Sequence, residues 1–393
     1  MRWTHDLGDV ITTRVVTEFG QIVAGMKNGT IVFLDLDTGE ELNRIDLAGA
    51  VQWIGIVDEL PDGDLRTVVL SRTEEFSSLM LLEGNQVEWE VRGTIMGFPS
   101  FVPDFRGSSV VVFGYIAEGQ KPARELAFVD LASGLLQRLS MVAIPVTPPR
   151  LGDLDQDGAL ETALLDTSGR LAVLAEDGQT LWMRDLNRPV LQAPIVADFM
   201  CEGDQEVLVP LDREPLLTLP ANLSLYDLSG TLLWSNTFPS TEIRSTAAVF
   251  LRSTSCRDVV VSLANGTLQA FRGDTGGSLW TTGLDAFRIL GADLQGDSLS
   301  DILALSEEKG PSAINGSTGN VLWDLPFYRP TRSAAPSRTA SGQVWMVLAG
   351  ENWISVLVSG PPQTDLSVLL LILIPIAVSV SIAALAYYVR RKG

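Results

Sequence analysis

Short apolar runs alternate with polar, glycine-containing loops along most of the chain. Runs such as IGIV, EVLVPL, DVVVSL and DILALS are only a few residues long, and each is bounded by residues that favour turns. Runs of this length are too short for buried helices and are typical of β-strands. The pattern therefore predicts one all-β domain over residues 1–360.

A two-stranded unit recurs along this domain with a period of about 45 residues. In AFRGDTGGSLW and AINGSTGNVLW, a strand leads into a tight glycine turn, and tryptophan follows the glycine by four residues in the next strand. The tryptophan position is occupied, in chain order, by Asn43, Trp89, Arg138, Trp182, Trp234, Trp280 and Trp323. Repeats of this period that contain only strands are the signature of β-propeller blades.

Each unit also has two short apolar strands before the hairpin, which gives four strands per blade. The inner strands are expected at roughly residues 11–17, 52–57, 97–103, 146–151, 191–197, 244–250, 288–293 and 331–336, which predicts an eight-bladed β-propeller.

The last blade has no outer strand of its own, because prolines and a long apolar segment follow residue 359. The opening stretch RWTHDL resembles the outer strands LWTTGL and LWMRDL. We therefore expect residues 2–7 to pair antiparallel with residues around 352–359, so that the N-terminal strand closes the ring.

The segment from residue 366 to residue 389 has no charge and is long enough to cross a bilayer. Basic residues follow it directly, and such flanks lie on the cytoplasmic side. We expect a linker at 361–365, one C-terminal transmembrane helix at 366–389, a cytoplasmic tail at 390–393 and the propeller outside the plasma membrane. Export would need a signal peptide upstream of Met1. The alternative, a tail-anchored protein with a cytosolic propeller, conflicts with the charged flank.

The charge and the motifs of the chain limit the classes of function that it can have. The formal net charge is −20 and few of the 28 basic residues are lysines, so no basic stripe is available to neutralise nucleic acid phosphates. The sequence has no G-x-S-x-G, H-E-x-x-H, phosphate-loop or C-x-x-C motif, and its one histidine, His5, falls in an expected outer strand. These observations favour binding over catalysis.

At the tryptophan hairpins the sequence resembles quinoprotein-like (PQQ-like) repeat propellers over nearly all of residues 1–360. Enzymes of that family have a vicinal cysteine pair and an acidic metal constellation under the quinone, whereas the two cysteines here are far apart in the sequence. Non-catalytic relatives act as protein-interaction scaffolds. The resemblance therefore implies a binding propeller without PQQ.

The stretch GDLDQDGALE resembles the calcium loop of integrin-like FG-GAP repeats. Alternate side chains of such a tight turn converge, and oxygen-only ligands favour a hard cation, so we expect a structural calcium ion in the fourth blade. The implied ligands are Asp153, Asp155, Asp157, the Ala159 carbonyl and Glu161. Related loops at residues 197–206 and 292–301 lack an acidic third position, and we interpret them as loops rather than sites.

Cys201 and Cys256 fall in the same polar loop of two consecutive units. Both should therefore lie on one rim of the propeller, and we expect a disulfide, which suits an oxidising exterior.

Two classes of function remain open. The first is a membrane-anchored surface propeller that binds a protein or glycan. The second is an exported enzyme, either quinone-dependent or acting through carboxylates in the central funnel. An assembly factor for membrane proteins is a narrower third option.

Overall fold

The computed structural model describes residues 2–105, 108–117, 125–140, 147–166, 169–188, 192–213, 219–325, 331–338 and 344–358. These residues form 31 β-strands and no helix, as the sequence predicts for an all-β domain. None of their segments is a helix long and apolar enough to cross a membrane. The predicted linker, transmembrane helix and tail at 361–393 lie outside the described residues.

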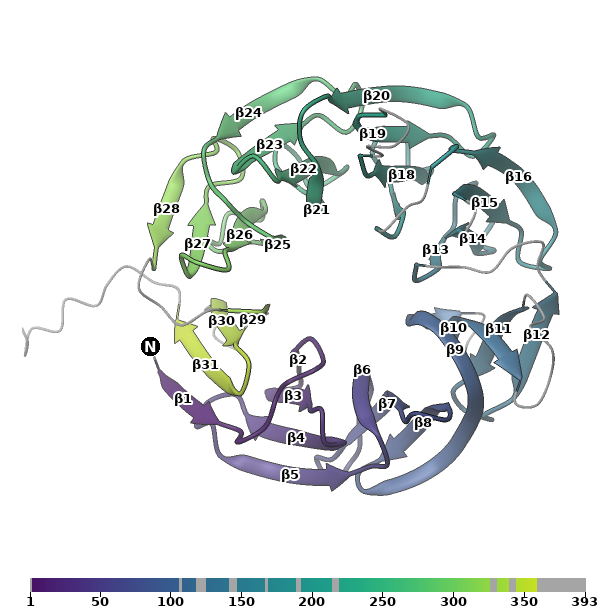
Figure 1. Cartoon of the computed structure of the whole chain (residues 1–393), viewed down its shortest axis with the longest axis vertical. Coiled ribbons are helices and arrows are strands. Elements are labelled where there is room, and N and C mark those ends of the chain that lie inside the picture. The colour runs from purple at the N-terminus through teal and green to yellow at the C-terminus, as the bar shows by residue number, and fades with distance from the viewer. Residues whose placement is uncertain are drawn as a thin grey trace, which may run out of the picture.

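The strands form seven antiparallel sheets that follow one another around a ring (Figure 1). Six sheets have four strands each, and in five of these the first strand in the sequence is innermost and the last one lies on the outside (Figure 1). The first of these five sheets consists of β2 (Val16–Glu18), β3 (Gln21–Gly25), β4 (Thr30–Asp35) and β5 (Glu41–Asp46). Two more consist of β13 (Arg150–Gly152), β14 (Glu161–Leu165), β15 (Arg170–Leu174) and β16 (Thr180–Asp185), and of β17 (Ile195–Ala197), β18 (Glu206–Leu211), β19 (Ala221–Tyr226) and β20 (Leu232–Phe238). The last two consist of β21 (Ile243–Val249), β22 (Asp258–Leu263), β23 (Thr267–Phe271) and β24 (Ser278–Thr282), and of β25 (Arg288–Ala292), β26 (Asp301–Leu305), β27 (Pro311–Ile314) and β28 (Val321–Asp324).

The remaining four-stranded sheet joins the two ends of the described chain. It consists of β29 (Ser333–Arg338), β30 (Val344–Ala349), β31 (Trp353–Val358) and, at its outer edge, β1 (Trp3–Asp6). In the β1–β31 pair, Trp3 lies opposite Val356 and Asp6 lies opposite Trp353. The predicted antiparallel pairing of the N-terminal strand is confirmed.

One sheet has seven strands: β6 (Ala50–Glu59), β7 (Leu65–Arg72), β8 (Ser77–Glu83), β9 (Gln86–Phe105), β10 (Ser108–Ala117), β11 (Glu125–Asp130) and β12 (Leu136–Ser140). Its middle strand, β9, pairs with β8 up to Gly93 and with β10 from Gly93 onward. The sequence predicts an outer strand at Trp89 and a separate inner strand at 97–103, whereas the structure runs both as one strand of 20 residues. The count of eight blades stays a prediction.

Tryptophans on the outer strands explain why the sequence repeats. Trp234 of β20 packs against Gly276, in the β23–β24 turn of the next sheet, and its indole N–H donates to the Gly273 carbonyl at 2.6 Å. Gly276 has a φ of +67°, and a Cβ there would lie 2.8 Å from the indole, so the turn requires glycine both for its backbone and for space. The same contact with the next sheet's turn glycine is made by Trp3, Trp182 and Trp280, and Trp89 packs in the same way against Gly134 within the seven-stranded sheet. Trp3, Trp182, Trp234 and Trp280 therefore each link their sheet to the following one.

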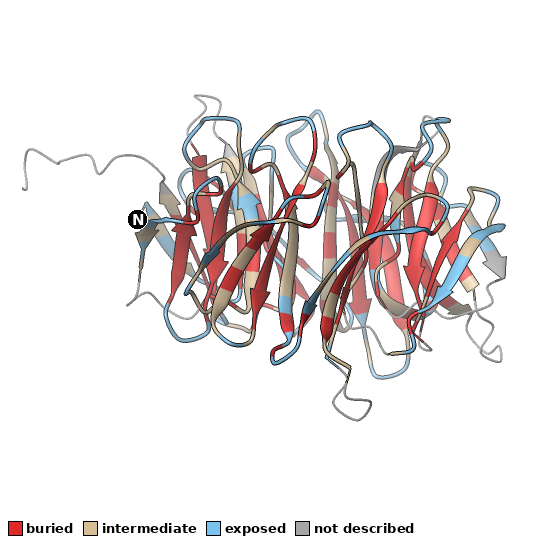
Figure 2. Cartoon of the chain, turned by 90° about the horizontal axis from the view of Figure 1, so that it is seen from above, coloured by how far each residue is buried: buried red, intermediate tan, exposed pale blue. Residues whose placement is uncertain are grey.

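Buried apolar side chains gather between neighbouring sheets rather than at a single centre. One cluster joins Ile22 and Leu34 of one sheet with Val347 and Ile354 of the sheet that contains β1. Seen from the side, the buried residues lie in the middle of the strands and the exposed ones in the loops at both faces (Figure 2). The loops at the faces and the inner ends of the strands are thus left to carry function.

Candidate functional site

The predicted metal loop connects β13 to β14 and brings three carboxylates together. Oxygens of Asp153, Asp155 and Glu161 lie within 4.8 Å of one another. Gly158 has a φ of +83°, which supplies the sharp bend that the motif requires. Asp153 Oδ2 accepts the Gly158 N–H at 3.2 Å, while Asp153 Oδ1 is buried and has no hydrogen-bond partner among the described residues. A buried acceptor without a partner, beside two further carboxylates, fits a bound cation.

Asp157 and Ala159 have a different role in this loop. The Asp157 carboxylate lies outside the group of three, and its Oδ1 accepts the Ala159 N–H at 2.7 Å. Asp155 Oδ1 in turn accepts the Asp157 N–H at 3.2 Å. The structure therefore brings together three of the four predicted carboxylates, and it uses Asp157 to hold the turn.

The position of Glu161 is acidic in four sheets. Glu161, Glu206, Asp258 and Asp301 each begin the second strand of a sheet, and all four are buried. Glu161 Oε2 accepts the Leu154 N–H at 2.7 Å, and Glu206 Oε2 accepts the Phe199 N–H at 2.8 Å. The carboxylate at this position thus stabilises the preceding loop through a backbone hydrogen bond, whether or not a metal binds. Burial raises the pKa of Glu161, and the charges of Asp155 and Asp157 raise it further.

Glu206 should make stability depend on pH. Burial raises the pKa of Glu206 from 4.5 to about 7, and the nearby charges of Asp198 and Asp204 contribute to the rise. Between pH 4.5 and pH 7 the folded chain holds a proton that the unfolded chain has lost, so the free energy of unfolding should fall as the pH rises through this window. Glu206→Gln keeps an oxygen acceptor without the charge. It should be more stable than the wild type at pH 8 by about 1–3 kcal/mol.

Urea unfolding at pH 5 and pH 8 measures this effect. The matched control is Glu202→Gln, which removes an exposed carboxylate of the same loop and should keep the wild-type pH dependence. An unchanged pH dependence in Glu206→Gln would assign the effect to other groups.

The two cysteines are bonded to each other in the structure, with their Cα atoms 4.8 Å apart. Cys201 lies in the loop between β17 and β18, and Cys256 lies in the equivalent loop between β21 and β22. The bond links two neighbouring sheets through the loops in which the sequence places the pair.

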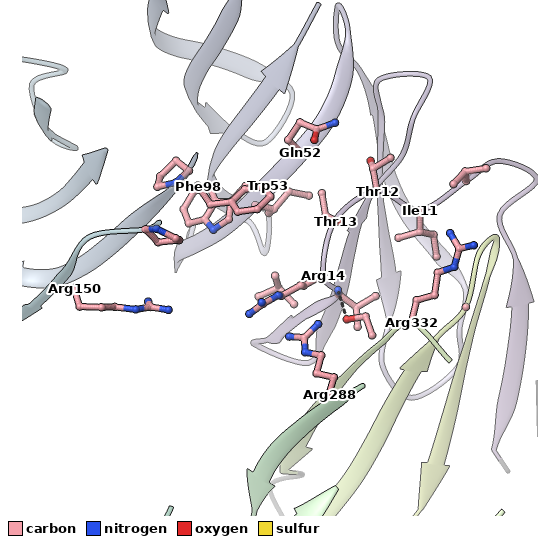
Figure 3. A pocket seen from close by; sticks show the side chains of 18 residues that line it. Ile11, Thr12, Thr13, Arg14, Gln52, Trp53, Phe98, Arg150, Arg288 and Arg332 are labelled. Atoms are coloured by element: carbon pink, nitrogen blue, oxygen red, sulfur yellow. Dashed lines mark hydrogen bonds between the residues drawn. The ribbon is translucent and has the colours of Figure 1, made fainter. Parts of the chain in front are cut away.

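A cavity of about 670 Å³ lies at the inner ends of the strands and was not predicted from the sequence (Figure 3). Four arginines line it, namely Arg14, Arg150, Arg288 and Arg332. Composition could not show this cluster, because the chain as a whole is acidic. The sequence does contain one signal, because Arg244, Arg288 and Arg332 recur at or within one residue of the start of three successive inner strands.

Apolar side chains are exposed on several outer strands. Leu181 and Met183 on β16 are 48% and 43% exposed, and Leu232 and Leu233 on β20 are 45% and 39% exposed. The two strands are close, since Arg184 of β16 donates to the Gly230 carbonyl at 2.6 Å, just before β20 begins. Val321 and Leu322 on β28, in another sheet, are also exposed, at 51% and 37%. We call Leu181, Met183, Leu232 and Leu233 the outer-strand patch.

The family model described as outer membrane protein assembly factor BamB matches residues 156–286 and, in an overlapping second match, residues 208–363, which together make up more than half of the chain. The chain belongs to this family. This family match confirms the PQQ-like repeat propeller that the tryptophan hairpins predict. No curated protein matches its sequence significantly.

Solved structures show the same fold at low sequence identity. The chain is similar to Sqt1 of Saccharomyces cerevisiae, with a TM-score of 0.66 and 11% identity over 91% of this chain and 98% of that one. It is also similar to the computationally designed Ika8 protein, with a TM-score of 0.61 and 15% identity over 90% and 98% of the two chains. A third similar structure is the biofilm matrix protein Bap1 of V. cholerae, with a TM-score of 0.60 and 11% identity over 91% of this chain and 87% of that one. These likenesses concern the fold alone.

Proposed function

We propose that this chain is a non-catalytic, membrane-anchored propeller that binds a protein partner and acts as an assembly factor or scaffold. Its family model is named for an assembly factor. The observation that carries the proposal is the outer-strand patch, where four large apolar side chains are exposed on two adjacent edge strands. Edge strands and exposed apolar clusters are surfaces that proteins use to bind other proteins.

The proposal includes the finer features expected from the sequence. The ring would have eight blades, with β9 serving as the outer strand of one blade and the inner strand of the next, and β1 would close it. Residues 366–389 would anchor the propeller on the outer side of the plasma membrane, with the tail in the cytoplasm. The loop at residues 153–161 would hold a structural calcium ion. A glycan ligand or an enzymatic role has no comparable support from the described residues.

Charged substitutions in the outer-strand patch should abolish partner binding. The tagged full-length chain carrying Leu232→Glu and Leu233→Glu should lose the protein that co-purifies with the wild type from a detergent extract of native membranes. Both side chains are exposed, so the melting temperature should change little. The matched control is Thr237→Glu, an exposed polar position of the same strand, which should keep the partner. A partner that the double variant retains would exclude this surface.

A further inference from the structure

The lining of the cavity brings together arginines that are far apart in the sequence. Arg14 lies between β1 and β2, Arg150 begins β13 and Arg288 begins β25. Figure 3 shows Arg14 and Arg288 close to each other, with Arg150 extending toward them from the opposite side of the cavity. One loop and two strands, far apart in the sequence, thus place guanidinium groups around one space.

Within the described ranges, Arg14, Arg150 and Arg288 make no ion pair with an acidic side chain, whereas ten other arginines do. Arg252 lies 2.7 Å from Asp258, and Arg170 lies 2.9 Å from Asp166. The chain has 48 acidic residues against 28 basic ones, so the arginines of the cavity do not lack counter-charges because acidic residues are scarce. The fourth arginine of the lining, Arg332, lies 3.6 Å from a carboxylate oxygen of Glu351.

Holding these charges together is unfavourable for the fold. Arg14 and Arg150 are exposed, yet partial desolvation by the surrounding chain lowers the pKa of Arg14, and this desolvation together with the charge of Arg14 lowers the pKa of Arg150. The same two causes lower the pKa of Arg288 to about 10. Unfavourable charge clusters that a fold retains are typical of binding sites, where a ligand supplies the missing counter-charge.

The lining also contains aromatic side chains. Phe98 is 48% exposed, and Trp53 lies beside it in the cavity (Figure 3). The Thr12 hydroxyl already donates to the Val51 carbonyl, so this hydrogen is not available to a ligand. A cavity of about 670 Å³ lies within the range of small-molecule sites, which have volumes of about 300–1,000 Å³.

We propose that this cavity binds a small organic anion that carries at least two carboxylate or phosphate groups, with Arg14, Arg150 and Arg288 as its ligands and Phe98 as its apolar contact. Arginine matches both groups through paired hydrogen bonds. A small anion is favoured over an acidic macromolecule because the chain's net charge of −20 repels a large acidic partner, while a small ion can enter the cavity.

Calorimetric titration of the purified full-length chain with two probes tests this inference. The probes are tricarballylate for carboxylates and phenyl phosphate for phosphates, in calcium-free buffer at constant ionic strength, with benzoate as the singly charged control. At least one probe should bind with one-to-one stoichiometry and more tightly than benzoate. Arg14→Ala and Arg288→Ala should each weaken binding by about tenfold or more, and Arg288→Lys should weaken it less.

The matched control is Arg244→Ala. Arg244 occupies the equivalent start of the neighbouring inner strand, but it pairs with Asp285 at 2.8 Å and does not line the cavity. Its loss should leave probe binding unchanged. Without any anion, Arg14→Ala should melt at a higher temperature than the wild type, because it relieves repulsion; an arginine with a purely structural role would give the opposite shift.

Three results would overturn the inference. The first is no binding of either probe. The second is binding that persists unchanged in Arg14→Ala and Arg288→Ala. The third is binding of a hexaglutamate peptide in the absence of binding by both small anions, which would assign the cavity to a macromolecular partner.

Discussion

Deleting residues 2–7 should lower the melting temperature of the chain more than any single substitution on an outer strand. The deletion removes β1, exposes the edge of β31 and removes the contacts that β1 makes with the first sheet. Trp3 makes two of these contacts. Its indole packs against Gly39, and its N–H donates to the Leu36 carbonyl at 3.0 Å.

The point variant Trp3→Ala should therefore cost about 3 kcal/mol of unfolding free energy, near the lower limit for removing a packed tryptophan, because Trp3 is only half-buried. Denaturant unfolding of the full-length chain measures this value. His5→Thr, on the same strand, should change it by no more than about 0.5 kcal/mol. Equal stability of Trp3→Ala and the wild type would show that β1 does not hold the ring together.

Calcium should raise the stability of the wild type by about 2.7 kcal/mol when its free concentration is a hundred times the dissociation constant. The reason is that Asp153, Asp155 and Glu161 converge within 4.8 Å and repel one another without a cation. The gain should vanish in Asp155→Ala and in Asp153→Asn. It should also shrink at low pH, because protons compete for Glu161, whose pKa burial raises.

Thermal unfolding with calcium and with a chelator provides the measurement. Asp177→Asn, in the turn between β15 and β16, removes an exposed carboxylate of the same sheet and should keep the full calcium effect. A melting temperature that calcium leaves unchanged, or an effect that survives in Asp155→Ala, would reduce the loop to a turn held by its own hydrogen bonds.

Most strands could be located from the sequence because each is a short apolar run between turn residues. The inner strands expected at 244–250 and 288–293 correspond to β21 at Ile243–Val249 and β25 at Arg288–Ala292. The error at β9 has a local cause. Gly93 and Gly97 suggest a break between two strands, but the chain absorbs the irregularity as a shift in register opposite β10 and continues as one strand.

The candidate sites also differ in how far the sequence alone could predict them. The calcium loop is contiguous, so the spacing of Asp153 and Asp155 is visible in the sequence itself. The arginine cavity is not, because Arg14, Arg150 and Arg288 become neighbours only when the sheets form a ring. The outer-strand patch was equally hidden, since a leucine in a strand pattern does not reveal whether another sheet covers it.

Photo-cross-linking from position 232 in native membranes tests the proposed function most directly. A benzoylphenylalanine in place of Leu232 should form a cross-link to one defined protein, because this exposed side chain lies in the outer-strand patch. The same probe in place of Thr237 should form none. Equal cross-linking from both positions, or none from either, would contradict a protein-binding role for this surface.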